Sequence, residues 1–252
     1  MNKPRVWMVA AFLVATSCGG RFSGFDLADE RGQDPGEPVL SFVWKRVVHD
    51  RTWDQSPQEF AAPTVEGDWL YLGSHGGIFF SLAVEDGSQR WQKRLGPMSS
   101  RAVVYRGYVY VGTDDGSLYA LDTRNGDVKW EYKSKGAIVA RPVVAGDMIV
   151  FANNDDHVFA LDLDTGKWRW QYERDTPEEL TVRGHAGVLL DGERVYCGFA
   201  DGNLVALSKS VGEVLWVRSL AGAATRFVDV DTTPTLSGGV LYASSTAGGL
   251  WA

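Results

Sequence analysis

The chain has 252 residues, of which 44% are hydrophobic and 23% charged, a composition that excludes general disorder. Its formal charge of −7 gives no basic footprint for nucleic acid, and no apolar run reaches the roughly 18 residues of a membrane-spanning helix. The chain also contains 29 Gly, ten Trp and nine Tyr. This mixture favours many short strands joined by turns.

The first residues have the features of an export signal. Lys3 and Arg5 precede an apolar stretch at 6–15, which is too short to span a membrane and is typical of a secretory signal. Small residues then lead into Cys18, and this stretch resembles a bacterial lipobox. The resemblance implies cleavage after residue 17, acylation of Cys18 with palmitate among the acyl groups, and, because Gly19 follows, sorting to the outer membrane. The alternative is an ordinary signal peptide that is cut near Cys18.

Residues 18–40 are polar, contain glycine and have neither a helical nor a strand period. They therefore indicate a flexible tether between the lipid and the folded part. The second cysteine, Cys197, lies in a strand-like stretch and is expected to be a small buried hydrophobe. If Cys18 carries lipid, Cys197 has no partner for an intramolecular disulfide.

A repeat of about forty residues organises the rest of the chain. Four Trp are separated by 39, 40 and 46 residues, and each is preceded by a Gly four residues earlier and a Leu nine residues earlier. We expect the Leu to pack between neighbouring units and the Trp to cover the gap to the next unit. The columns are Leu82, Leu121, Leu161 and Leu207; Gly87, Gly126, Gly166 and Gly212; and Trp91, Trp130, Trp170 and Trp216.

Each copy divides into four short segments. In the second copy they are 101–104, 108–112, 117–121 and 127–132, and Asp115-Gly116 and Asn125-Gly126 stand in two of the breaks. Such dipeptides supply the positive φ angles of tight hairpin turns. Each copy is therefore predicted to be a four-stranded antiparallel meander, and a series of such units indicates a β-propeller. A two-layer sandwich is the alternative fold, but it predicts no repeat of this regularity.

The copies predict an all-β chain with about four and a half blades of an expected eight, truncated at its C-terminus. The signal peptide is 1–17, the lipidated tether 18–40 and the partial propeller 41–252. Residues 42–45 look like an isolated outermost strand. The blades are expected near 62–94, 101–133, 140–173, 185–219 and 232–252.

Two kinds of segment carry a family resemblance. The stretches 117–122 (SLYALD) and 157–162 (HVFALD) resemble the repeat of the pyrroloquinoline-quinone-like propeller superfamily. The stretches 180–184 (LTVRG) and 229–234 (DVDTTP) resemble the BamB family of outer-membrane assembly lipoproteins. The resemblance implies an eight-bladed, non-enzymatic scaffold on the periplasmic face of the outer membrane, which binds the periplasmic domains of a BamA-like protein. The partner-binding residues that it implies are Leu180, Val182, Arg183, Asp229 and Asp231.

The spacing of the repeat places these two stretches together. The Trp spacing lengthens after Trp170, and the connection at 219–231 is also long. Both connections run from an outermost strand to the innermost strand of the next blade, so both are expected on one face of the propeller as a single patch. In the alternative, Leu180 and Val182 tuck under the rim and Asp231 caps the turn before Thr232.

Other chemistry finds no support in the sequence. A quinone cofactor would need a vicinal cysteine pair, the run 153–157 (NNDDH) falls where each copy has a solvated turn, and the four His lack zinc spacing. We therefore expect no enzyme activity, cofactor, metal, nucleic acid or small-molecule substrate. The alternative function is a generic exported quinoprotein-like propeller that binds another ligand or has lost an enzyme site.

Overall fold

The computed structural model describes residues 43–47, 61–174, 186–224, 227–247 and 249–252. The chain separates into two units, Met1–Val43 and Trp44–Ala252, and every described strand lies in the second. Cys18, the signal and the tether lie outside the described residues. Within the described ranges, no helix is long and apolar enough to cross a membrane.

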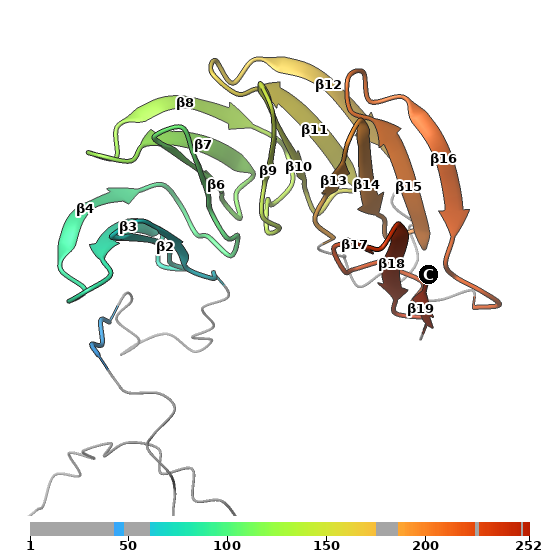
Figure 1. Ribbon diagram of the computed structural model, residues 1–252, viewed down its shortest axis with the longest axis horizontal. Coiled ribbons are helices and arrows are strands. Elements are labelled where there is room, and N and C mark those ends of the chain that lie inside the picture. The colour runs from blue at the N-terminus through green and yellow to red at the C-terminus, as the bar shows by residue number, and fades with distance from the viewer. Residues whose placement is uncertain (1–42, 48–60, 175–185, 225–226, 248) are drawn as a thin grey trace, which may run out of the picture. The chain divides into compact units, whose positions relative to one another are not determined.

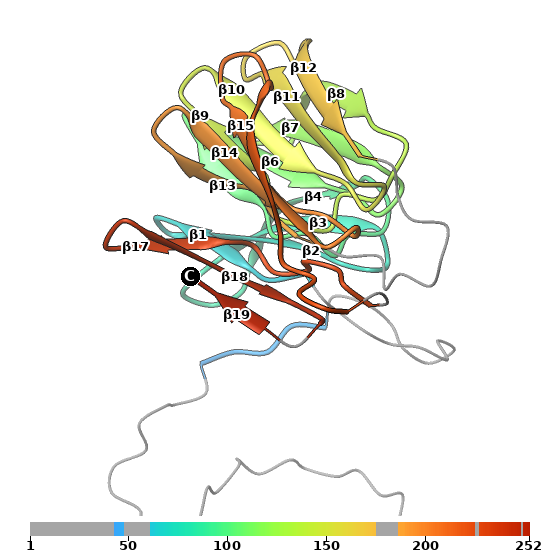
Figure 2. The same cartoon turned by 90° about the vertical axis from the view of Figure 1, so that its right-hand side faces the viewer.

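Five antiparallel sheets follow one another along the chain and form an arc (Figure 1). In the side view, neighbouring sheets face one another (Figure 2). The first blade is β1 (Thr64–Glu66), β2 (Trp69–Gly73), β3 (Ile78–Ala83) and β4 (Gln89–Arg94); the second is β5 (Val103–Tyr105), β6 (Tyr108–Gly112), β7 (Ser117–Asp122) and β8 (Val128–Lys133); the third is β9 (Val143–Ala145), β10 (Met148–Ala152), β11 (His157–Asp162) and β12 (Trp168–Glu173); the fourth is β13 (Leu189–Asp191), β14 (Arg194–Gly198), β15 (Asn203–Ser208) and β16 (Val214–Ser219); and the fifth is β17 (Thr235–Ser237), β18 (Val240–Ser245) and β19 (Gly249–Trp251).

The predicted all-β class and the four-stranded antiparallel meander are confirmed. In the second blade the innermost strand begins at Val103, two residues later than expected. Ahead of this strand the Ser100 hydroxyl accepts the Gly112 N–H at 3.2 Å, and the inner strands of the other blades are equally short, with three residues each. The ladder between the third and fourth strands shifts register beside the Leu column in each of the first four blades, and such a bulge increases the local twist.

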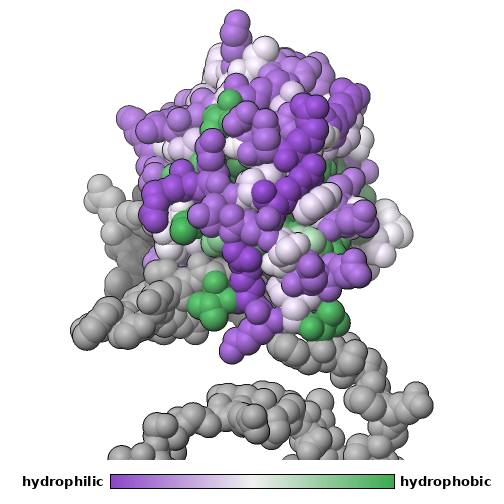
Figure 3. Space-filling view, turned by 90° about the vertical axis from the view of Figure 1, so that its left-hand side faces the viewer, coloured by the Kyte–Doolittle hydropathy of each residue, from purple (hydrophilic) through white to green (hydrophobic). Residues whose placement is uncertain are grey.

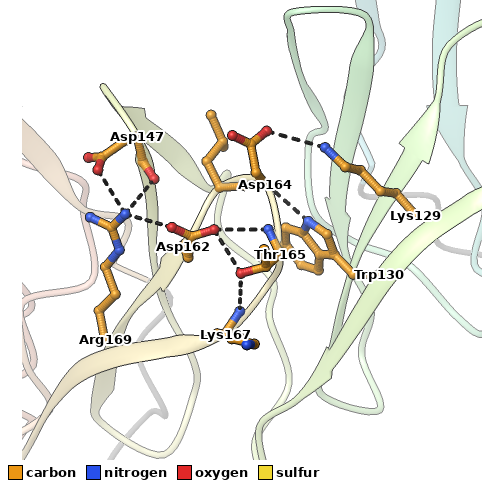
Figure 4. A network of polar contacts seen from close by, with 9 residues as sticks. Lys129, Trp130, Asp147, Asp162, Asp164, Thr165, Lys167 and Arg169 are labelled. Atoms are coloured by element: carbon orange, nitrogen blue, oxygen red, sulfur yellow. Dashed lines mark hydrogen bonds and ion pairs between the residues drawn. The ribbon is translucent and has the colours of Figure 1, made fainter.

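The repeated Trp join neighbouring blades, as expected. The Trp130 ring lies against the turn of the third blade, where a Cβ on Gly166 would come within 2.6 Å of it. Its indole N–H donates to the Leu163 carbonyl at 3.0 Å, and Lys129 contacts Asp164 beside it (Figure 4). Trp91 and Trp170 make the corresponding bonds to Thr123 and Lys209. Trp91, Trp130 and Trp170 therefore each close the outer side of the gap that follows their own blade, whereas Trp216, in the fourth blade, is half-buried.

Trp44 makes the same contact with the first blade. Its indole N–H donates to the Val84 carbonyl at 2.8 Å, and its ring occupies the space where a Cβ on Gly87 would stand. Residues 43–47 form no assigned strand. Trp44 nevertheless lies where the outermost strand of a preceding blade would place its Trp, in agreement with the role expected for 42–45.

The core consists of apolar layers between blades. Leu121, for example, packs with Trp91, Tyr71 and Phe79 of the preceding blade, and all four are buried. This arrangement confirms the expected position of the Leu column. The outer side of the arc near the first blades is largely hydrophilic, with scattered apolar side chains (Figure 3). Burial between blades is therefore the main apolar contribution to stability.

Candidate functional site

One face of the arc carries the turns between the second and third strands of each blade and the connections between blades. We call it the loop face; its described turns are 74–77, 113–116, 153–156 and 199–202. The connection between the second and third blades, for example, is fixed to the turns by backbone hydrogen bonds: Ser134 N–H donates to Gly116 of its own blade, and Asn154 N–H of the next blade donates to Ala137. The described parts of the loop face therefore form a hydrogen-bonded rim.

The connection between the fourth and fifth blades is held firmly on this rim. The Val230 N–H donates to the Phe199 carbonyl at 3.1 Å. A Cβ on Gly198 would come within 2.4 Å of Val230, and one on Gly202 within 2.9 Å of Val228. The two glycines thus make room for two Val side chains, which wedge the segment 227–231 against the fourth blade.

Asp229 occupies an unusual place in this segment. Its side chain is fully buried, and neither carboxylate oxygen has a hydrogen-bond partner among the residues that the structure describes. Its backbone carbonyl, in contrast, accepts the N–H and the hydroxyl of Thr246 at 2.9 and 3.0 Å. A buried carboxylate without a donor is costly, by about 1–3 kcal/mol or more. Such a group makes Asp229 a candidate functional residue.

Sequence reasoning had placed Asp229 and Asp231 together on a surface patch. In the structure Asp229 is interior, and Asp231 is half-buried at the entry to β17. The turn before β17 is tied by the Thr232 hydroxyl, which accepts the Ser244 N–H at 3.3 Å. Leu180, Val182 and Arg183 lie outside the described residues.

Phe227 is a feature that the sequence analysis missed. It is 48% exposed, and its backbone has φ of +52°, a left-handed conformation that a bulky residue rarely adopts. The Thr246 hydroxyl donates to its carbonyl at 2.8 Å and holds this conformation. An exposed aromatic ring on a strained, anchored backbone is typical of a binding surface. No local sequence signal distinguishes it, because the positive φ accompanies a tertiary contact with Thr246 in the turn that follows β18.

The sequence analysis also missed an ion pair, Arg174 with Asp201, which joins the third and fourth blades. It lies where the long connection between these two blades begins. The Arg174 Nε donates to Asp201 at 2.6 Å, and its Nη1 lies 3.1 Å from the Tyr172 hydroxyl. Burial would lower the pKa of Arg174, but the bonds to Tyr172 and Asp201 outweigh it and raise this pKa. The corresponding positions in other copies are Leu95, Ser134 and Leu220, so a register-aligned comparison of the copies could have singled out this Arg.

Cys197 is buried, as expected, and burial raises the pKa of its thiol far above the ordinary range. It lines a cavity of about 10 Å³ with Asp156 and Val230, which is the space of a single water molecule. Such a thiol is not a nucleophile at neutral pH. In the part of the chain that the structure describes, no three His, Cys, Asp or Glu side chains are grouped to hold a metal ion.

The model of a protein family described as "Outer membrane protein assembly factor BamB" matches residues 81–252, more than half of the chain. The chain belongs to the BamB family. BamB of Salmonella typhimurium is 36% identical over 206 residues, which cover 75% of this chain and 52% of that protein. The chain therefore spans about half the length of this relative.

The fold agrees with a solved member of the BamB family. The crystal structure of BamB from Moraxella catarrhalis matches with a TM-score of 0.68 and 30% identity, covering 76% of this chain and 60% of that one. A quinohemoprotein alcohol dehydrogenase from Pseudomonas putida matches with a TM-score of 0.57 and 18% identity, covering 75% and 39%. At that identity the second likeness concerns the propeller fold alone.

Proposed function

We propose that this protein is a non-enzymatic scaffold of the outer-membrane β-barrel assembly machinery and that it binds the periplasmic domains of a BamA-like protein. The observation that carries the proposal is the BamB family match over 81–252. Export through residues 1–17, acylation of Cys18 and the tether 18–40 would hold the propeller at the periplasmic face of the outer membrane. The mass of the mature N-terminal peptide tests the lipid.

The partner-binding patch of this proposal comprises Leu180, Val182, Arg183, Asp229 and Asp231. Strand β16 leads into the segment 227–231, and β12 leads into the connection that carries the other three residues. The anchoring of 227–231 supports a preorganised surface, because an immobile segment loses little entropy on binding. Asp229 is buried, so its role in this proposal is to position the segment, and its carboxylate oxygens can still accept hydrogen bonds. The exposed ring of Phe227 supplies an apolar anchor nearby.

The alternative function is that of a quinoprotein-like propeller with a ligand or a lost enzyme site. The dehydrogenase-like fold is the observation in its favour. Against it, the two cysteines of the chain, Cys18 and Cys197, are far apart in sequence and form no vicinal pair. A visible absorption band or a calcium dependence of the purified protein would favour this alternative over the scaffold.

Capture of the protein by immobilised periplasmic domains of the BamA-like partner tests the scaffold function. We expect Arg183→Glu and Asp231→Lys each to weaken capture at least about tenfold, equivalent to about 1.4 kcal/mol. The matched controls are Arg194→Glu and Glu213→Lys, which make the same charge changes at exposed positions away from the loop face. Capture of all four variants with equal affinity, with their melting temperatures unchanged, would remove the patch from the proposal.

A further inference from the structure

The inner strands β1, β5, β9, β13 and β17 line the concave side of the arc. Two residues before each of these strands, the chain leaves the loop face and enters the blade. The residues at this position therefore form one ring level of the inner wall, the concave surface that the inner strands make. This level lies at the mouth of the inner wall, where that surface meets the loop face. The residues at this level are Ala62, Arg101, Arg141, Gly187 and Thr233.

Side chains at this level reach toward the preceding blade. The Thr233 hydroxyl of the fifth blade accepts the Gly187 N–H of the fourth blade at 3.0 Å. Arg101 follows the same rule, because its Nε donates to the Thr64 hydroxyl of the first blade at 3.4 Å. Arg141 stands at the same register position of the third blade, next to the second blade that carries Arg101, because β5 and β9 are in contact.

Among the residues that the structure describes, the two arginines have no counter-charge. Neither forms an ion pair with any residue of the described ranges, although the chain has 32 acidic residues against 25 basic ones. Other arginines are paired: Arg124 with Asp122, Arg169 with Asp147, and Arg174 with Asp201. Both guanidinium groups at the mouth belong to exposed residues, so a solute can reach them.

The two charges also interact with each other. Partial burial, and then repulsion from Arg101, lower the pKa of Arg141. Two like charges held together without a counter-ion cost stability. The Thr64 bond uses only the Nε of Arg101 and leaves its two terminal nitrogens available, and Arg141 has no hydrogen bond to any described residue. A guanidinium group whose terminal nitrogens have no partner can donate hydrogen bonds to two oxygens of one anion.

We propose that Arg101 and Arg141 form a binding site for an oxyanion, a phosphate or carboxylate group, at the mouth of the inner wall on the loop face. The anion lies beside the second blade, between the Arg101 guanidinium, which is bonded to Thr64 of the first blade, and Arg141 of the third blade, and it accepts hydrogen bonds from the terminal nitrogens of both residues. It neutralises the repulsion between them. The small neutral residues at the other positions of this level leave space for the rest of a ligand.

Calorimetric titration of the purified protein with inorganic phosphate, and separately with succinate, tests this site at constant ionic strength. We expect saturable one-site binding with a dissociation constant on the order of 1 mM for at least one of the two anions. The anion that binds more tightly identifies the ligand class. The double variant Arg101→Gln/Arg141→Gln should bind this anion at least about tenfold more weakly.

A matched variant separates the site from general charge effects. Arg194→Gln/Arg218→Gln removes the same charge from exposed positions of the fourth blade, and its anion binding should equal that of the unmodified protein. In chloride, the Arg101→Gln/Arg141→Gln variant should melt at or above the temperature of the unmodified protein, because the repulsion is gone. Absence of binding by both anions, equal binding by the two double variants, or a markedly lower melting temperature of the variant at the mouth would overturn the proposal.

Discussion

Replacement of Trp130 by Ala tests how the blades are held together. The Trp130 side chain is 8% exposed, and its ring contacts Gly166 of the next blade and lies 5.8 Å from the Tyr110 ring at a tilt of 45°. Its N–H also satisfies the Leu163 carbonyl. The substitution therefore removes apolar area, an aromatic contact and a hydrogen bond, and it opens a cavity between two blades.

The expected cost follows from these losses. A buried Trp that is cut back to Ala destabilises a protein by about 3–5 kcal/mol, including the cavity that remains. The unpaired carbonyl of Leu163 adds to the cost, although water that enters the opened gap can satisfy it. For a chain of this size, each kcal/mol lowers the melting temperature by about 2–4 °C, so a fall of roughly 10 °C is expected.

Calorimetric melting of the purified protein measures this effect. Trp168 offers a control on β12, the outermost strand of the third blade, because it is 54% exposed and its replacement by Ala should change stability by only about 0.5 kcal/mol. Both variants lose the same side chain, so the difference between them reports the contact across the gap. If Trp130→Ala melts no lower than Trp168→Ala, the reasoning about the Trp column is refuted.

Three further perturbations test the charges and the loop face. Hydrogen bonds from Arg169 and Thr165 lower the pKa of Asp162 to about 2 (Figure 4). The contribution of Asp162 to stability is therefore complete above the unfolded pKa of about 4 and is lost as the pH falls toward 2. Acid titration of Arg169→Gln should show a smaller loss of stability than the unmodified protein between these pH values. Asp229→Asn removes a buried charge without a donor, so it should leave stability unchanged or raise it while weakening partner capture; a large loss of stability would show that the carboxylate is paired in solution. Phe227→Ala should weaken capture about tenfold or more with an unchanged melting temperature, and unchanged capture would exclude the ring from the interface.

The local architecture follows closely from the sequence. Leu121, Gly126 and Trp130 recur with their counterparts at fixed spacings, and tight turns with glycine separate the strands. These features act between residues that are close along the chain, because each hairpin pairs a strand with the next one. The order of strands within a blade, the buried Leu and the crossing Trp could therefore be predicted, with an error of two residues at the start of the innermost strand of the second blade.

The candidate site depended on the fold in a different way. Asp229 and Asp231 are two residues apart, yet one is interior and the other half-buried. The left-handed backbone of Phe227 needs Thr246, which is 19 residues away, and Arg174 meets Asp201 across 27 residues. None of these relations has a period in the sequence, because each arises where one blade contacts the next.

The sequence by itself determined what each blade is, since strand alternation, turn glycines and the Leu and Trp columns are encoded within some forty residues. Only the tertiary structure decided which charged side chains are buried, as Asp229 is, and which are paired, as Arg174 and Asp201 are. The physical reason is that burial and Coulomb energy depend on distances between blades, and these distances are set by how the sheets pack against one another rather than by the order of residues within any one of them.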